Sequence, residues 1–295
     1  MQQTTWGWLI VIYLFLGGLG AGAFLGSALA YKGFFGKLNE RFYKFGFLLA
    51  PVAVITGTVL LLFDLAPSAA INPFKIIQLY TQPTSMMSIG TYLLTFFIIV
   101  SLLIYLKALK ANKICDHMLM LGVILAIGVM GYTGLLLYVV KAIPLWASIW
   151  VPIIFVISAV STGISANAIV TLQAGHRLTH SVHKFHAVLV LLEIISIIML
   201  FAIVSREPAG FASVSFITSG TLAPVFWIGF VLLGLFLPLV SASGVFLGNN
   251  CCVTTDGNTC LAHAEINSSI VNEIAVLIGG FCLRVFMIFG AFYIF

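Results

Sequence analysis

Charged residues are scarce in this chain of 295 residues, since Asp, Glu, Lys and Arg together make up 7% of it. A soluble domain of this length needs a far more charged surface to stay dissolved. Hydrophobic residues account for 62% of the chain, and its mean hydropathy is +1.19. The net charge of +5 does not indicate nucleic-acid binding, because the basic residues are spread over short loops. The composition therefore excludes an ordinary soluble domain.

Histidine is missing from the places where a membrane haem would need it. A membrane b-type haem requires axial imidazoles buried in facing helices. The six histidines lie in loops or near the ends of the apolar runs: His117, His176, His180, His183, His186 and His263. We expect no haem in this chain, and hence no electron transfer across the bilayer by this chain alone.

Cysteine is also sparse, and its spacing indicates no disulfide framework. Two clusters offer metal-ligand side chains. The histidines from His176 to His186 include no Cys or carboxylate, which favours a basic cytoplasmic connector over a metal site. The second cluster, which matches no standard zinc or iron–sulfur spacing, consists of Cys251, Cys252, Cys260 and His263. We expect no metal ion in this chain.

Apolar runs of about 20 residues or more recur along the whole sequence, and each could cross a hydrocarbon core of roughly 30 Å. Such long, continuous runs satisfy their backbone polar groups as helices, not as barrel strands. We predict an all-α, polytopic membrane protein with one integral domain, 1–295, divided into four-helix halves at 1–144 and 145–295. The eight predicted spans are about 7–31, 45–66, 86–107, 117–140, 148–172, 186–205, 222–247 and 271–294.

The basic residues predict the orientation, because cytoplasmic loops carry an excess of Lys and Arg. Nine of them follow the first, third or fifth span, and three fall on the other side. We therefore predict a multi-pass protein of the cytoplasmic membrane with both termini outside, and no cleavable signal peptide. The nine are Lys32, Lys37, Arg41, Lys44, Lys107, Lys110, Lys113, Arg177 and Lys184; the three are Lys75, Lys141 and Arg206.

Ionisable residues within membrane spans are costly, and each is a candidate functional residue. Asp64 closes the outer end of the second span, where an interfacial cap is the alternative interpretation. Glu193 lies mid-span and must be protonated, paired or exposed to a polar cavity. Arg284 in the last span needs a carboxylate, carbonyls or water, and a structural ion pair is its alternative. From their depth we predict a proton pathway through Asp64, Glu193 and Arg284.

Glycines at four-residue spacing mark one face of the first span: Gly18, Gly22 and Gly26. Small residues at this spacing let another membrane helix approach closely. The surrounding string GGLGAGA superficially matches a dinucleotide fingerprint. It lacks a preceding strand and lies inside an apolar run, so we reject that interpretation.

Four strings, in order along nearly the whole chain, resemble the polysulfide reductase membrane subunit family, also called the NrfD family. They are WGWLIVIYLFLGGLGAGAF, FDLAP followed by PTSMMSIGTYLL, GYTGLLLYVVKAIPLWASIWVPIIF, and IGGFCLRVFMIFG.

The resemblance implies an eight-helix subunit of a respiratory oxidoreductase complex, without redox cofactors of its own. Such a subunit binds quinone or quinol, of the menaquinone or ubiquinone type, near the outer membrane face. A ferredoxin-like iron–sulfur subunit would dock over that face, with a catalytic subunit, often a molybdopterin enzyme, beyond it.

The family's quinone-binding tyrosine falls on Tyr132, and its acidic residue in helix two falls on Asp64. Some members also place Asn and His at the start of helix one. This chain departs from them, because the same region offers Gln2, Gln3, Trp6, Trp8 and Tyr13. Two other classes stay open: a secondary transporter, which also buries charged residues, and a purely structural anchor for other subunits.

Overall fold

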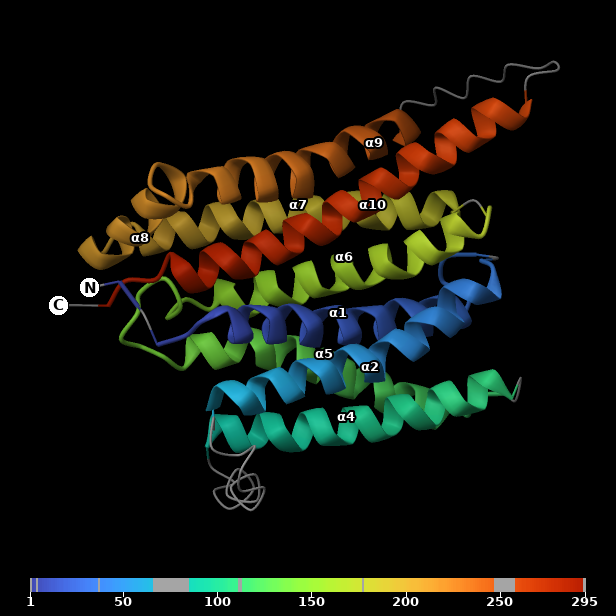
Figure 1. The fold of residues 1–295 in the computed structure, drawn as a ribbon, viewed down its shortest axis with the longest axis horizontal. Helices are drawn as coiled ribbons and strands as arrows, with labels where there is room; N and C mark the ends of the chain where they lie inside the picture. Colours follow the sequence, from blue (N-terminus) through green and yellow to red (C-terminus); the bar gives the residue numbers. More distant parts are fainter. Residues whose placement is uncertain are drawn as a thin grey trace.

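A computed structural model describes residues 2–3, 5–36, 38–65, 85–110, 113–176, 178–246 and 258–293, and helices make up most of this part of the chain (Figure 1). The helices are α1 (Trp8–Tyr31), α2 (Glu40–Leu65), α4 (Met86–Leu109), α5 (Asp116–Tyr138), α6 (Trp150–Gln173), α7 (His180–Val204), α8 (Pro208–Thr218), η1 (Val225–Phe236), α9 (Leu237–Phe246) and α10 (Asn258–Phe289).

Seven of the described helices are long and apolar enough to cross a membrane: α1, α2, α4, α5, α6, α7 and α10. The predictions of an all-α class and of a multi-pass membrane protein are thus confirmed. The predicted span at 222–247 forms as π-helix η1 followed directly by α9, and its apolar part, Val225–Ser241, is shorter than the seven. The count of eight spans therefore stays a prediction.

Two helices begin well before their predicted spans. Helix α10 starts at Asn258, not near residue 271, and α7 starts at His180, not near residue 186. A helix can continue past the hydrocarbon region as a polar segment, where hydropathy gives no signal. Helix α8 was not predicted, because its 11 residues are too few to cross a membrane.

The helices pack in two groups with α1 and α6 in contact between them (Figure 1). In the first group α1 packs on α2 and α5, and α4 packs on α2 and α5. In the second group α6 packs on α7 and α10, and the run of η1 and α9 packs on α10 and α7. These groups correspond to the halves 1–144 and 145–295, whose status as separate units stays a prediction.

The glycine face of α1 packs on α6, which confirms the expected close approach. A methyl group on Gly22 would overlap the carbonyl of Ala159, and one on Gly163 would overlap the backbone of Gly22. Along the same face, Gly18 lies against Ala159 and Gly26 lies against Ile164. The contact between the two groups thus depends on glycine at the points where the backbones meet.

The outer surface of the bundle is apolar, while buried positions include many polar side chains. Large hydrophobic residues are exposed along α4, α5 and α7, among them Phe96, Ile99, Met120, Ile124 and Ile198. Contiguous apolar surface on this scale would aggregate in water and is what a lipid-facing surface requires. The fold therefore turns large apolar side chains toward lipid and encloses a set of polar side chains within its apolar interior.

Both termini lie at the same end of the bundle (Figure 1). Gln3 Nε2 donates hydrogen bonds to the carbonyl oxygens of Trp6 (3.0 Å) and Ile288 (3.2 Å). Gln2 Nε2 donates to the carbonyl oxygen of Phe289 (2.8 Å). The two glutamines that open the sequence thus fasten the N-terminal segment to the end of α10.

Candidate functional site

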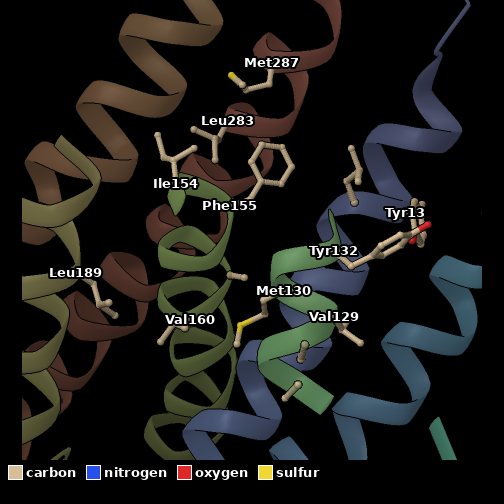
Figure 2. Close-up of a cluster of buried hydrophobic side chains, with 14 of the residues drawn as sticks. Tyr13, Val129, Met130, Tyr132, Ile154, Phe155, Val160, Leu189, Leu283 and Met287 are labelled. Carbon is tan, nitrogen blue, oxygen red and sulfur yellow. The ribbon is translucent and has the colours of Figure 1, made fainter. Parts of the chain in front are cut away.

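Tyr132 on α5 points toward Tyr13 on α1, near the end of the bundle that carries the termini (Figure 2). Tyr13 is fully buried and Tyr132 is 3% exposed. The two phenols lie within interaction range, yet the Tyr13 hydroxyl forms no well-aligned hydrogen bond in the described part of the chain. A buried phenol needs a hydrogen-bond partner in an apolar interior, and Tyr132 supplies only an imperfectly aligned one.

Gly90 on α4 closes the third side of this tyrosine pair. A methyl group on Gly90 would overlap the tip of the Tyr132 ring, including its hydroxyl. Helix α4 can therefore approach the ring only because residue 90 has no side chain. The phenol of Tyr132 is enclosed by three helices of the first group: α1, α4 and α5.

Asp64 lies near the end of α2, on the same end of the bundle as the tyrosine pair. Gly57 on α2 packs beside Tyr13, since a methyl group there would lie 3.4 Å from the Tyr13 ring. Asp64 is seven residues further along the helix, or about 10 Å along its axis. The structure places Asp64 between the tyrosine pair and the bundle end, half-buried.

Arg284 on α10 is fully buried where α1, α6 and α10 meet. Its Nη1 donates hydrogen bonds to the Ser158 hydroxyl on α6 (2.6 Å) and to the Gly280 carbonyl (2.7 Å). Its guanidinium carbon lies 5.2 Å from the centre of the Phe155 ring. Nε and Nη2 have no hydrogen-bond partner among the described residues. The described residues therefore satisfy the guanidinium only in part.

Glu193 on α7 is 5% exposed and approaches the Ser158 hydroxyl, within electrostatic range of Arg284. The structure thus brings together two of the predicted site residues, Glu193 and Arg284, around a serine from a third helix. Asp64 is not part of this cluster, because it lies on α2 in the other helix group.

The Arg284 cluster adjoins the tyrosine pair across α1. A methyl group on Gly18 would lie 3.2 Å from Arg284 Nη2, and one on Gly17 would lie 3.5 Å from the Thr133 side chain. Thr133 follows Tyr132 on α5. Of these consecutive glycines, Gly18 therefore faces Arg284 and Gly17 faces the residue that follows Tyr132.

A second buried polar pair lies toward the other end of the bundle. His186 Nδ1 on α7 is 3.6 Å from Glu273 Oε2 on α10, and both side chains are at most 6% exposed. Glu273 also approaches the hydroxyl of Ser165 on α6. Ser165 is seven residues from Ser158, about 10 Å along the helix axis. Buried Ser161 and Thr162 lie between them, so polar side chains line α6 from one cluster to the other.

Sequence reasoning did not assign functional roles to Ser158, Ser165 or the pair of His186 with Glu273. A signal was present, because polar residues recur every three or four positions in SAVSTGIS of an otherwise apolar span. That spacing places them on one helix face. Tyr13 was noted as a residue of the helix-one region, but its pairing with Tyr132 could not be read from the chain.

The expectation that neither the histidine cluster nor the Cys251–His263 cluster binds a metal ion stays a prediction. Cys251 and Cys252 lie outside the described residues, and the side chains of His180, Cys260 and His263 are also outside them. His176 lies in the turn before α7, while His183 and His186 lie within α7.

Membrane-length helices around buried ionisable side chains define the chain as a multi-pass integral membrane protein. The chain belongs to the family described as "Polysulphide reductase, NrfD", which matches it over residues 1–295.

Relatives in this family include components of reductase complexes. The chain is 29% identical to a polysulfide reductase chain of Wolinella succinogenes, over 98% of this chain and 95% of that protein. It is 28% identical to an NrfD homologue of Haemophilus influenzae, over 97% and 94% respectively. It is also 29% identical to a selenate reductase subunit of Mesobacillus selenatarsenatis, over 55% of this chain and 46% of that protein.

Proposed function

We propose that this chain is the membrane subunit of a respiratory oxidoreductase complex and binds quinone or quinol beside Tyr132. Two of its relatives are named as components of reductases, which supports a role in such a complex. In this proposal an iron–sulfur subunit docks on the outer face, where both termini lie, and a catalytic subunit, often a molybdopterin enzyme, lies beyond it. Electrons would pass between quinol and an iron–sulfur cluster of the docked iron–sulfur subunit.

The observation that carries the proposal is the buried Tyr13 hydroxyl, which faces Tyr132 and has no well-aligned hydrogen bond among the described residues. Quinol oxidation releases two electrons and two protons, and each ring oxygen needs a hydrogen-bond partner. A phenol can donate to a quinone oxygen or accept from a quinol hydroxyl. Two phenols in an apolar enclosure therefore offer matching groups at one end of a quinone ring, while the isoprenoid tail extends into lipid.

Asp64 is the proposed proton acceptor on the outer side. It lies about two helical turns beyond Tyr13, toward the bundle end, and is half-buried. A carboxylate there can take a proton released during quinol oxidation and pass it to water. Its distance from the tyrosines suits a proton carrier better than a direct ligand of the ring.

The second proposed element is a proton route through the other helix group. Glu193 and Arg284 adjoin the tyrosine pair across Gly17 and Gly18, and the serines of α6 lead from them toward Glu273 and His186. Side-chain hydroxyls and buried water can relay protons between such groups. This route would connect quinone chemistry with the opposite face of the membrane.

Two rival functions make different predictions. A structural anchor needs no phenol at position 132, so its replacement would leave electron transfer unchanged. A secondary transporter would move a solute in vesicles that contain this chain without its partners. Neither rival requires the pairing of Tyr13 with Tyr132.

The test is oxidation of a quinol analogue by the intact purified complex, with wild type compared with Tyr132→Phe and Asp64→Asn. We expect both variants to assemble with their partners and to lose most of the quinol-dependent electron transfer. Tyr138→Phe, the same substitution six residues further along α5, is the matched control and should retain activity. Full activity in Tyr132→Phe and Asp64→Asn would refute the site.

A further inference from the structure

A pocket lies between helix ends, and none of the proposed quinone or proton residues lines it. These helix ends are at the end of the bundle opposite the termini (Figure 1). Its volume is about 130 Å³. It forms where α1 and α4 end and where α2 and α5 begin. The lining residues are Tyr31, Glu40, Tyr43, Lys44, Ala108, Lys113 and Ile114.

The charges that line the pocket leave an excess of positive charge. Lys44 Nζ lies 2.5 Å from Glu40 Oε2, so these two charges offset each other. Lys113 also lines the pocket, and no ion pair of Lys113 occurs within the described ranges. The remaining positive charge of Lys113 suits the binding of an anion.

The tyrosines add a neutral hydrogen-bond donor. The backbone N–H of Ile114 donates to the Tyr31 hydroxyl at 3.2 Å. Because this hydroxyl oxygen accepts, its own proton remains available for donation into the pocket. The Tyr31 ring packs edge-on against Tyr43, with centroids 5.6 Å apart, which fixes the ring at the pocket wall. A lysine beside a phenol donor is a suitable environment for a phosphate oxygen.

An apolar stripe runs from this pocket along α2. Leu48, Val52, Ile55 and Val59 follow Lys44 at helical spacing, and each is between 36% and 51% exposed. These positions share one face of the helix. A soluble anion would gain nothing from this stripe, whereas an acyl chain beside it would cover it. The stripe therefore favours a lipid over free phosphate.

We propose that this pocket binds the phosphate headgroup of an anionic membrane lipid, with its acyl chains along the apolar stripe of α2. The inference does not depend on the quinone site. Basic pockets between helices on the cytoplasmic side of membrane proteins bind such headgroups. The end of the bundle that carries this pocket also carries most of the basic residues, so it would face the leaflet with anionic lipid.

The experiment is native mass spectrometry of the purified complex after exchange into phosphatidylglycerol or phosphatidylcholine nanodiscs. We expect wild type to retain phosphatidylglycerol in preference to phosphatidylcholine. Lys113→Gln should lower this retention about fivefold, the effect of one lysine near an anionic surface. Lys113→Arg should keep it. Lys184→Gln, which removes the same charge at the same end but outside the pocket, should bind like wild type.

Three outcomes would overturn the proposal. The first is equal retention of phosphatidylglycerol by wild type and Lys113→Gln. The second is an equal loss in Lys184→Gln, which would mean that only the overall charge matters. The third is complete displacement of the lipid by excess inorganic phosphate, which would identify free phosphate as the ligand. Quinol oxidation by Lys113→Gln should be unchanged, so this proposal and the proposed function fail separately.

Discussion

Arg284 on α10 donates a 2.6 Å hydrogen bond to the Ser158 hydroxyl on α6, and each residue is at most 1% exposed. Glu193 on α7 approaches the same hydroxyl. Ser158 therefore joins three helices of the second group through one oxygen atom. A guanidinium does not lose its proton inside a protein, so its stabilisation depends on such acceptors.

Ser158→Ala should destabilise the protein, because it removes this acceptor and leaves a buried cation less satisfied. A hydrogen bond to a charged group contributes about 1.5–3 kcal/mol, and we expect a loss of that size. Unfolding by titration with a denaturing detergent measures it. Ser196→Ala is the control, because the Ser196 hydroxyl donates to the Leu192 carbonyl of its own helix. Equal stability of the two variants would contradict the assigned role of Ser158.

Gly90→Ala should disturb the tyrosine pair, because the added methyl group overlaps the Tyr132 ring. Small displacements at a reacting site cost up to about a hundredfold in rate, and we expect a loss of roughly ten- to a hundredfold in quinol oxidation. Gly131→Ala is the matched control, since a methyl group at that position meets nothing within 4 Å apart from its chain neighbours and the backbone of its own helix. The prediction fails if the two variants oxidise quinol equally fast.

Glu193→Gln should uncouple proton movement from quinol oxidation while leaving electron transfer in place. The amide keeps the shape of the side chain but cannot take up and release a proton. Proton uptake in vesicles that contain the complex, measured per electron transferred, should fall. Glu207→Gln, at an exposed position beside α8, is the control. If turnover and proton uptake were unchanged in Glu193→Gln, Glu193 would not be part of the proton route.

Gly22→Ala should loosen the contact between the two helix groups, because the methyl group overlaps the carbonyl of Ala159. Overpacking of a tight contact typically costs about 1–3 kcal/mol. Detergent unfolding of this variant should therefore begin earlier than that of Gly131→Ala, which adds the same methyl group in open space. Equal stability of Gly22→Ala and Gly131→Ala would mean that the contact tolerates the methyl group.

Much of the fold follows from hydropathy. Seven apolar runs become membrane-length helices, because in the hydrocarbon core the backbone N–H and C=O groups must hydrogen-bond within the segment. Hydropathy failed at the start of α10, whose sequence is largely polar, and at the short helix α8, because polar or short segments carry no such signal. It also gave no indication that Val225–Phe236 is a π-helix, since this helix type depends on backbone hydrogen bonding and not on residue class.

The candidate site was predictable only in part. The sequence predicts Glu193 and Arg284 as candidate functional residues, because charge inside an apolar span is costly. Their meeting at Ser158 could not be predicted, because it depends on the relative depth and rotation of α6, α7 and α10. Tyr13 was likewise one of several polar residues near the N-terminus until the fold placed it opposite Tyr132. Gln2 and Gln3, from the same stretch, instead fasten the N-terminal segment to α10.

Photoaffinity labelling of the intact complex with an azido-quinone would locate the quinone itself. We expect the label to attach to peptides of α1, α4 or α5 that contain Tyr13, Gly90 or Tyr132, and excess quinol analogue to prevent this labelling. Displaceable labelling confined to α6, α7 or α10 would place the quinone in the other helix group and refute a quinone site beside Tyr132.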